Sequence, residues 1–144
     1  MKTKLTIAFV LIFLSGCATA YKPIGFTGGY SDTQLGDNIF RVSFRGNGYT
    51  SSERATDFSL LRSAELALDH GFKYFVIVKS GERTKTSLHT APATMYTGKS
   101  IYTISKPRAT STIFCYKDKP DVNGVVFDAK FITRSIRQKY GLKK

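Results

Sequence analysis

Apolar and polar residues alternate along residues 39–45, which read Ile-Phe-Arg-Val-Ser-Phe-Arg. A period of two places Phe40, Val42 and Phe44 together on one face of an extended chain. The opposite face is polar and carries Arg41, Ser43 and Arg45. We therefore predict a half-buried strand, which the Gly-Asn-Gly segment at residues 46–48 ends.

The spacing of apolar residues changes to three and four after residue 50. One helical face would be formed by Ala55, Phe58, Leu61, Ala64 and Leu68. Thr50 and Glu53 lie three residues apart and resemble a capping box, while Gly71 fits a left-handed helix end. The pattern predicts a helix that ends near His70.

Further elements follow this helix. The apolar run within residues 72–78 is typical of a central strand, and residues 110–117 read as another strand. Asp128 would cap a last helix that reaches Tyr140. Between these elements, 12 of the 29 residues at 84–112 are Ser or Thr, with Pro107 as a breaker, which predicts a hairpin or loop.

The order of these elements indicates an α+β fold. We expect a two-layer sandwich with a mostly antiparallel sheet, a strand–helix–strand core and a C-terminal helix. Both helices would pack on one face of the sheet, because each has a single apolar face.

The N-terminus has the pattern of an export signal. Lys2 and Lys4 precede an apolar run that is too short to cross a bilayer as a helix. The next residues, Leu-Ser-Gly-Cys at 14–17, resemble the lipobox of bacterial lipoproteins. The resemblance implies cleavage between Gly16 and Cys17 and a diacylglyceryl thioether on Cys17. The alternative is a cleaved secretory signal with an incidental cysteine.

This interpretation divides the chain into three parts. Residues 1–16 would be a cleaved signal peptide, residues 17–37 a lipid anchor and tether, and residues 38–144 a single α+β domain. Ala18, rather than Asp, follows the cysteine. By resemblance to enterobacterial sorting rules, that residue implies retention at the periplasmic face of the outer membrane.

The charge of the chain is strongly positive, at +12. Loss of Lys2 and Lys4 with the signal leaves 20 basic and 10 acidic residues, a net charge of +10. Nucleic acid is excluded as a partner by the expected location outside the cytoplasm. The remaining anionic partners are lipid headgroups, lipopolysaccharide phosphates and acidic protein surfaces; the alternative is a basic surface without a dedicated partner.

No catalytic or metal-binding pattern is present in the sequence. His70 and His89 are the only histidines, and neither has a Cys or carboxylate cluster beside it. We therefore predict a protein that is not an enzyme, with no metal, no cofactor and no small-molecule substrate. Cys115 would be the only cysteine without a lipid, which predicts a buried, inert thiol or, alternatively, an intermolecular disulfide.

Arg62 and Glu65 lie three residues apart in the predicted helix. Their spacing favours an ion pair within the helix. The alternative is a charge at the sheet edge that fixes the orientation of the helix.

Three segments carry a resemblance to a known family. They read Gly-Tyr-Ser-Asp at 29–32, Phe-Arg-Val-Ser-Phe-Arg-Gly-Asn at 40–47, and Leu-Leu-Arg-Ser-Ala-Glu-Leu-Ala-Leu-Asp-His-Gly-Phe-Lys-Tyr-Phe at 60–75. These segments, and the closing helix at 127–140, are similar to a family of small uncharacterised lipoproteins of Gram-negative bacteria. The resemblance implies a lipid-anchored protein and supplies no catalytic residue.

Two functions from different classes follow. The first is an adaptor or structural subunit of an envelope assembly, with a protein partner at a sheet edge or at the Ser/Thr-rich segment. The second is a binder of an anionic envelope component, either lipopolysaccharide or peptidoglycan. A cluster of basic side chains around a cleft would favour the second, while an unpaired sheet edge or an exposed apolar patch would favour the first.

Overall fold

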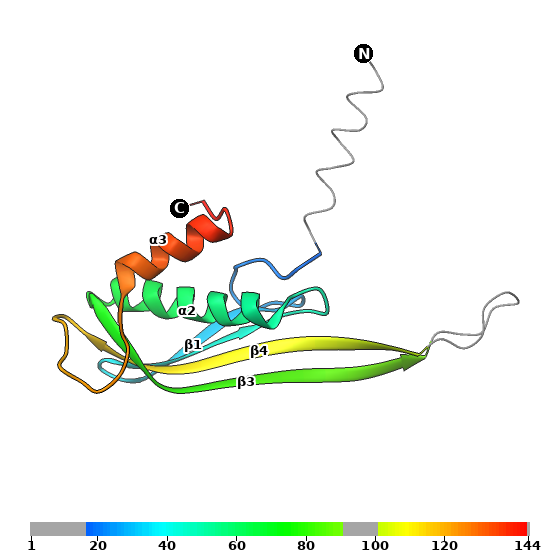
Figure 1. The fold of residues 1–144 in the computed structure, drawn as a ribbon, viewed down its shortest axis with the longest axis horizontal. Coiled ribbons are helices and arrows are strands. Elements are labelled where there is room, and N and C mark those ends of the chain that lie inside the picture. Colours follow the sequence, from blue (N-terminus) through cyan, green and yellow to red (C-terminus); the bar gives the residue numbers. More distant parts are fainter. Residues whose placement is uncertain (1–16, 91–100, 144) are drawn as a thin grey trace, which may run out of the picture.

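A five-stranded antiparallel sheet forms one layer of the molecule, and two helices form the other (Figure 1). The computed structural model describes residues 17–90 and 101–143. The strands, in the spatial order β1-β2-β4-β3-β5, are β1 (Gly29–Gly36), β2 (Ile39–Arg45), β3 (Tyr74–Thr90), β4 (Ile101–Tyr116) and β5 (Val126–Asp128). The helices are α2 (Ser52–Asp69) and α3 (Ala129–Lys139). The predicted α+β fold is confirmed.

Strand β2 places its side chains as the alternating pattern predicts. Phe40, Val42 and Phe44 are buried against the helix layer, while Arg41 and Arg45 are exposed on the opposite face. The ring of Phe44 packs edge-on against Phe58 of α2, with 5.1 Å between the ring centroids. One face of the sheet therefore forms the core, and no helix of the described residues covers the other face (Figure 1).

Helix α2 begins one residue later than its predicted capping box. Ser51 is the N-cap, and its side chain accepts a hydrogen bond from the Arg54 N–H. Thr50 instead accepts a hydrogen bond from the backbone of Thr19, which lies 31 residues earlier in the chain. The predicted helix end is confirmed, because Gly71 has a φ of +79°. Four of the five predicted core positions are buried; Leu68 is not.

Strands β3 and β4 form a long hairpin that projects beyond the other strands (Figure 1). The Ser/Thr-rich segment, predicted as a hairpin or loop, is paired between these two strands up to Thr90 and Ile101, and residues 91–100 lie outside the described residues. Pro107 was expected to interrupt the regular structure of the hairpin but lies inside β4. Its carbonyl accepts a hydrogen bond from the Gly46 N–H, on the β2 side. A proline is tolerated at this position because its nitrogen, which carries no hydrogen, faces the end of β2 and not β3. The hydrogen bonds between β4 and β3 are therefore intact.

Residues 29–36, expected to belong to a tether, form the edge strand β1. The chain before β1 is also held on the domain. Tyr21 packs against Phe58, with 5.3 Å between ring centroids, and its hydroxyl donates a hydrogen bond to Glu65. The folded domain therefore begins well before residue 38.

The closest ion pairs of Arg62 and Glu65 connect α2 to other elements, although Arg62 also lies 3.8 Å from Asp69 within the helix. Arg62 binds Asp32 of β1 at 2.8 Å, and Glu65 binds Arg137 of α3 at 2.6 Å. The expected Arg62–Glu65 pair is therefore wrong, and the alternative, a charge at the sheet edge, fits the observed pairing. Asp128 caps α3, as predicted. No helix in residues 17–90 or 101–143 is long and apolar enough to cross a membrane.

Candidate functional site

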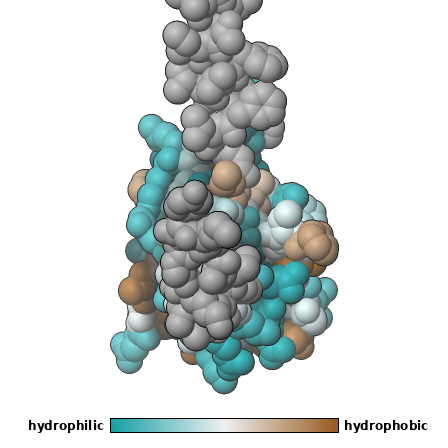
Figure 2. All heavy atoms as spheres, turned by 90° about the vertical axis from the view of Figure 1, so that its right-hand side faces the viewer, coloured by the Kyte–Doolittle hydropathy of each residue, from teal (hydrophilic) through white to brown (hydrophobic). Residues whose placement is uncertain are grey.

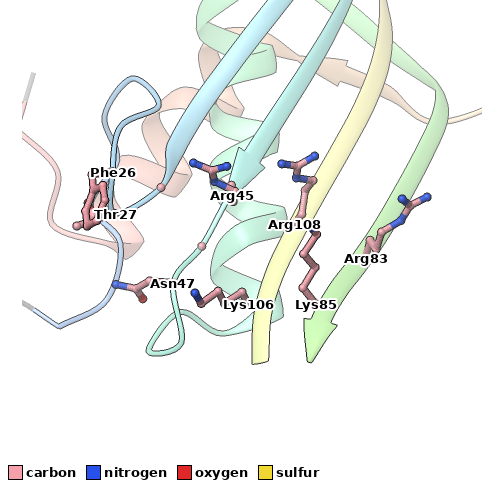
Figure 3. A pocket seen from close by; sticks show the side chains of 10 residues that line it. Phe26, Thr27, Arg45, Asn47, Arg83, Lys85, Lys106 and Arg108 are labelled. Atoms are coloured by element: carbon pink, nitrogen blue, oxygen red, sulfur yellow. The ribbon is translucent and has the colours of Figure 1, made fainter. Parts of the chain in front are cut away.

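A basic cleft of about 610 Å³ lies where β2 ends and the β3–β4 hairpin continues (Figure 3). Its cationic lining comes from three neighbouring strands: Arg45 of β2, Arg83 and Lys85 of β3, and Lys106 and Arg108 of β4. Its other wall is the loop that holds Phe26, Thr27 and Gly28, together with Gly46 and Asn47. We call this feature the cationic cleft.

The five basic residues of the cationic cleft occupy two rows across the sheet. Arg108 is paired in register with Arg45 on one side and with Arg83 on the other. Lys85 and Lys106 are paired with each other in the next row. Neighbouring strands are about 4.8 Å apart, and like charges directly opposite one another are destabilising. The cleft therefore concentrates positive charge at a cost to the fold.

A β-bulge brings the two basic residues of β3 to this face. Ile77 pairs with Ile113 on the helix side, whereas Lys79 pairs with Thr112 on the open side, so Val78 is an extra residue. A one-residue shift exchanges the two faces of a strand. Without the bulge, Arg83 would face α2, which is the direction that Glu82 takes in the structure.

The carboxylates of the strands point away from the cationic cleft. Asp32 of β1 binds Arg62 of α2, and Glu82 of β3 accepts a hydrogen bond from Thr56 of α2 at 2.7 Å. All ten acidic residues of the chain lie within the described residues, and none lines the cleft. The sheet thus keeps its negative charge on the helix side and its positive charge on the open side.

The loop that faces the basic residues is a tight turn with an aromatic tip. Gly25 and Gly28 exchange backbone hydrogen bonds of 3.0 and 3.1 Å, and Phe26 between them is fully exposed. Gly28 has a φ of +105°, and a Cβ there would lie 2.2 Å from the Arg45 carbonyl oxygen. Only glycine allows the loop to approach the end of β2 so closely. The glycine-rich segment at residues 25–29 is therefore a tight turn.

Cys17, the predicted lipid site, lies beside the cationic cleft. It is exposed, and its carbonyl accepts a hydrogen bond of 2.8 Å from the Asn47 side chain. Two residues later, Thr19 is buried: its hydroxyl donates to the Thr27 carbonyl and accepts from the Asn47 N–H. Only Ala18 separates Cys17 from this fixed point. Gly16, the other predicted cleavage residue, lies outside the described residues.

Cys115 and His70, the other candidate residues whose side chains the structure describes, form no further site. Cys115 is buried in β4 without a disulfide, and burial raises the pKa of its thiol to about 12, which supports the inert interpretation. The backbone N–H of His70 caps α2, and its ring contacts Phe40. The described ranges contain no group of three or more His, Cys, Asp or Glu side chains that could hold a metal.

Arg45 is recognisable from the sequence as outward-facing, but its four basic partners were missed. Their signal was present, because Arg-Thr-Lys at 83–85 and Lys-Pro-Arg at 106–108 lie on either side of residues 86–105, the middle of the Ser/Thr-rich segment. A hairpin that closes this segment brings both triplets together. No family model, curated protein or solved structure matches the chain. The resemblance to small lipoproteins therefore stays a prediction.

Proposed function

We propose that the protein is a lipid-anchored, non-enzymatic lipoprotein at the periplasmic face of the outer membrane, and that its cationic cleft binds a phosphate-bearing component of the envelope. The proposal combines the lipobox at Cys17 with the five basic side chains of the cleft. The single observation that carries it is the alignment of Arg45, Arg108 and Arg83 directly opposite one another.

An anion in the cationic cleft would relieve the repulsion between these arginines. Guanidinium groups bind phosphate oxygens through paired hydrogen bonds, and they stay charged at every physiological pH. Among the described residues outside the cleft, Arg62, Arg137 and Lys139 have carboxylate partners, and Lys139 has two, Glu53 and Asp57. The cationic cleft contains no such partner among its lining residues.

Titration of the purified lipoprotein in non-ionic detergent tests this proposal. Inorganic phosphate and lipopolysaccharide would be added separately, and binding measured by calorimetry at low and at high salt. The triple variant Arg45→Gln, Arg83→Gln and Arg108→Gln should lose most of the binding. Binding to wild-type protein should weaken with salt, because the interaction is electrostatic.

A matched variant separates the cationic cleft from the overall charge. Lys117→Gln, Lys119→Gln and Lys130→Gln remove the same three positive charges from exposed positions that do not line the cleft. This control should bind like the wild type. If both triple variants lose binding equally, the ligand responds to net charge alone, and the cleft is not its site.

The adaptor function remains as a second proposal because β3 has an unpaired edge. Strand β5 pairs only with Tyr74, Phe75 and Val76, so the following residues of β3 within the described part pair with β4 alone. Such an edge accepts a strand from another protein. Shortening the hairpin outside the cationic cleft, by removal of residues 87–104, should abolish crosslinking to a protein partner in intact cells. Unchanged crosslinking would reject this function.

A further inference from the structure

The site expected to carry the lipid is held against the wall of the cationic cleft. Asn47 lines the cleft, and its side chain binds the Cys17 carbonyl. Its backbone N–H also donates to the buried Thr19. These contacts fix Cys17 directly on the folded domain, with no flexible segment between the two. Acyl chains on Cys17 would therefore bring the cleft, and not just the chain end, close to the bilayer surface.

Two exposed aromatic side chains lie at or beside the cationic cleft. Phe26 forms the tip of the glycine turn at the cleft, and Tyr49 is exposed in the β2–α2 loop beside Asn47. In membrane-bound proteins, aromatic side chains are enriched at the headgroup level of the bilayer. Seen from the hairpin end, much of the described surface around the hairpin is hydrophilic, with separate apolar areas (Figure 2).

The charges of the cationic cleft complement an anionic headgroup layer. Figure 3 shows Lys106 extending toward Asn47, the residue that holds Cys17. Electrostatic attraction acts over about 8–10 Å at physiological salt, so cations this close to the anchor lie within reach of the surface. Basic side chains beside a membrane anchor strengthen the attachment and restrict how the domain is oriented.

We propose that the cationic cleft docks on anionic phospholipid headgroups of the same leaflet that holds the acyl chains of Cys17, with Phe26 in the interface. The domain then rests on its own membrane in one orientation instead of moving freely on a tether. This inference rests on the lipid anchor and on the anion-binding cleft of the proposed function, and it commits the ligand to the phospholipid phosphate.

A single tryptophan tests this docking. The chain contains no Trp, so Phe26→Trp gives a unique fluorescence signal at a fully exposed position. The lipidated variant would be reconstituted into vesicles of phosphatidylcholine alone, or with about one third phosphatidylglycerol. The lipid anchor holds the protein on both, so any difference reports headgroup charge.

We expect a blue-shifted emission and quenching by brominated lipids only in the vesicles that contain phosphatidylglycerol. High salt, or the addition of Arg45→Gln, Arg83→Gln and Arg108→Gln, should abolish both effects. The control variant is Phe131→Trp, because Phe131 is also exposed and lies on α3 of the helix layer. Its indole should stay in water in all vesicles.

The outcomes separate this inference from the proposed function. If the indole of the Phe26→Trp variant stays in water on both vesicle types while the protein still binds lipopolysaccharide or inorganic phosphate, the docking is wrong and the anion-binding cleft stands. If that indole is buried equally on neutral vesicles, the headgroup charge has no role and the docking as stated is rejected. If the triple arginine variant binds every anion like the wild type, both proposals fail.

Discussion

Replacing Arg108 should stabilise the fold, because this residue faces two other arginines. Arg108 lies opposite Arg45 and Arg83 on neighbouring strands, and no acidic side chain lines the cleft. Each cross-strand pair of like charges costs up to about 1 kcal/mol, and the exposure of these side chains to water reduces that cost. We therefore expect Arg108→Gln to raise the free energy of unfolding by roughly 0.5–1.5 kcal/mol.

Thermal unfolding at low salt measures this effect, as a rise in Tm on the order of 2–6 °C for a domain of this size. The matched control is Arg41→Gln, because Arg41 faces the same side of the sheet but lies opposite the neutral Thr33 and Thr112. It should leave Tm almost unchanged. High salt should reduce the difference between Arg108→Gln and the wild type. If the Arg108 variant melts at or below the wild type at low salt, the three arginines do not repel one another and the argument for an anion site loses its basis.

Four further results are expected. Thr19→Val should cost about 1–3 kcal/mol of unfolding free energy, since it leaves the Thr27 carbonyl without its partner and the Asn47 N–H with only its longer bond to Thr50. The exposed Thr27→Val should change the unfolding free energy by less than about 0.5 kcal/mol, and equal melting curves would show that Thr19 does not hold this part of the chain. Cys17→Ser should stay uncleaved and unacylated, and normal processing seen by mass spectrometry would reject the lipid site. Leu61→Ala should cost roughly 2–5 kcal/mol in chemical denaturation, because Leu61 is fully buried. Burial and the hydrogen bond to Glu65 raise the pKa of Tyr21, so the folded protein keeps the hydroxyl proton at a pH at which the unfolded chain loses it. The free energy of unfolding should therefore fall above about pH 10. In pH-dependent denaturation, Tyr21→Phe should make that decline smaller.

Local sequence patterns predict the elements whose partners lie nearby in the chain. The alternation around Val42 gives the buried face of β2, and Asp128 gives the start of α3. Strand β1 is harder to recognise because most of its side chains are exposed, so it has no apolar period. The N-cap of α2 differs by one residue because Thr50 is bound by Thr19, a contact that no local pattern contains.

The cationic cleft depends on long-range register in the same way. Arg45 can be placed on the open face from the pattern of β2 alone. The basic residues of β3 cannot, because the bulge at Val78 reverses the direction of every later side chain in that strand. A strict period of two would have turned Arg83 and Lys85 toward the helix layer and Glu82 into the cleft. The net charge of the site would then appear to be +2 instead of +5.

The separation of charge across the sheet is therefore a property of the fold and not of composition. The chain has ten carboxylates, enough to pair with every cation of the cleft, yet β3 directs Glu82 to Thr56 while it directs Arg83 to the open face. Folding alone does not favour this arrangement, since opposite charges across the strands would be more stable than like ones. An anion bound from outside the chain would make the arrangement of like charges the more stable one. Because Asn47 joins the cleft to Cys17, acylation of Cys17, as we propose, would make the surface of the protein's own membrane the nearest source of such an anion.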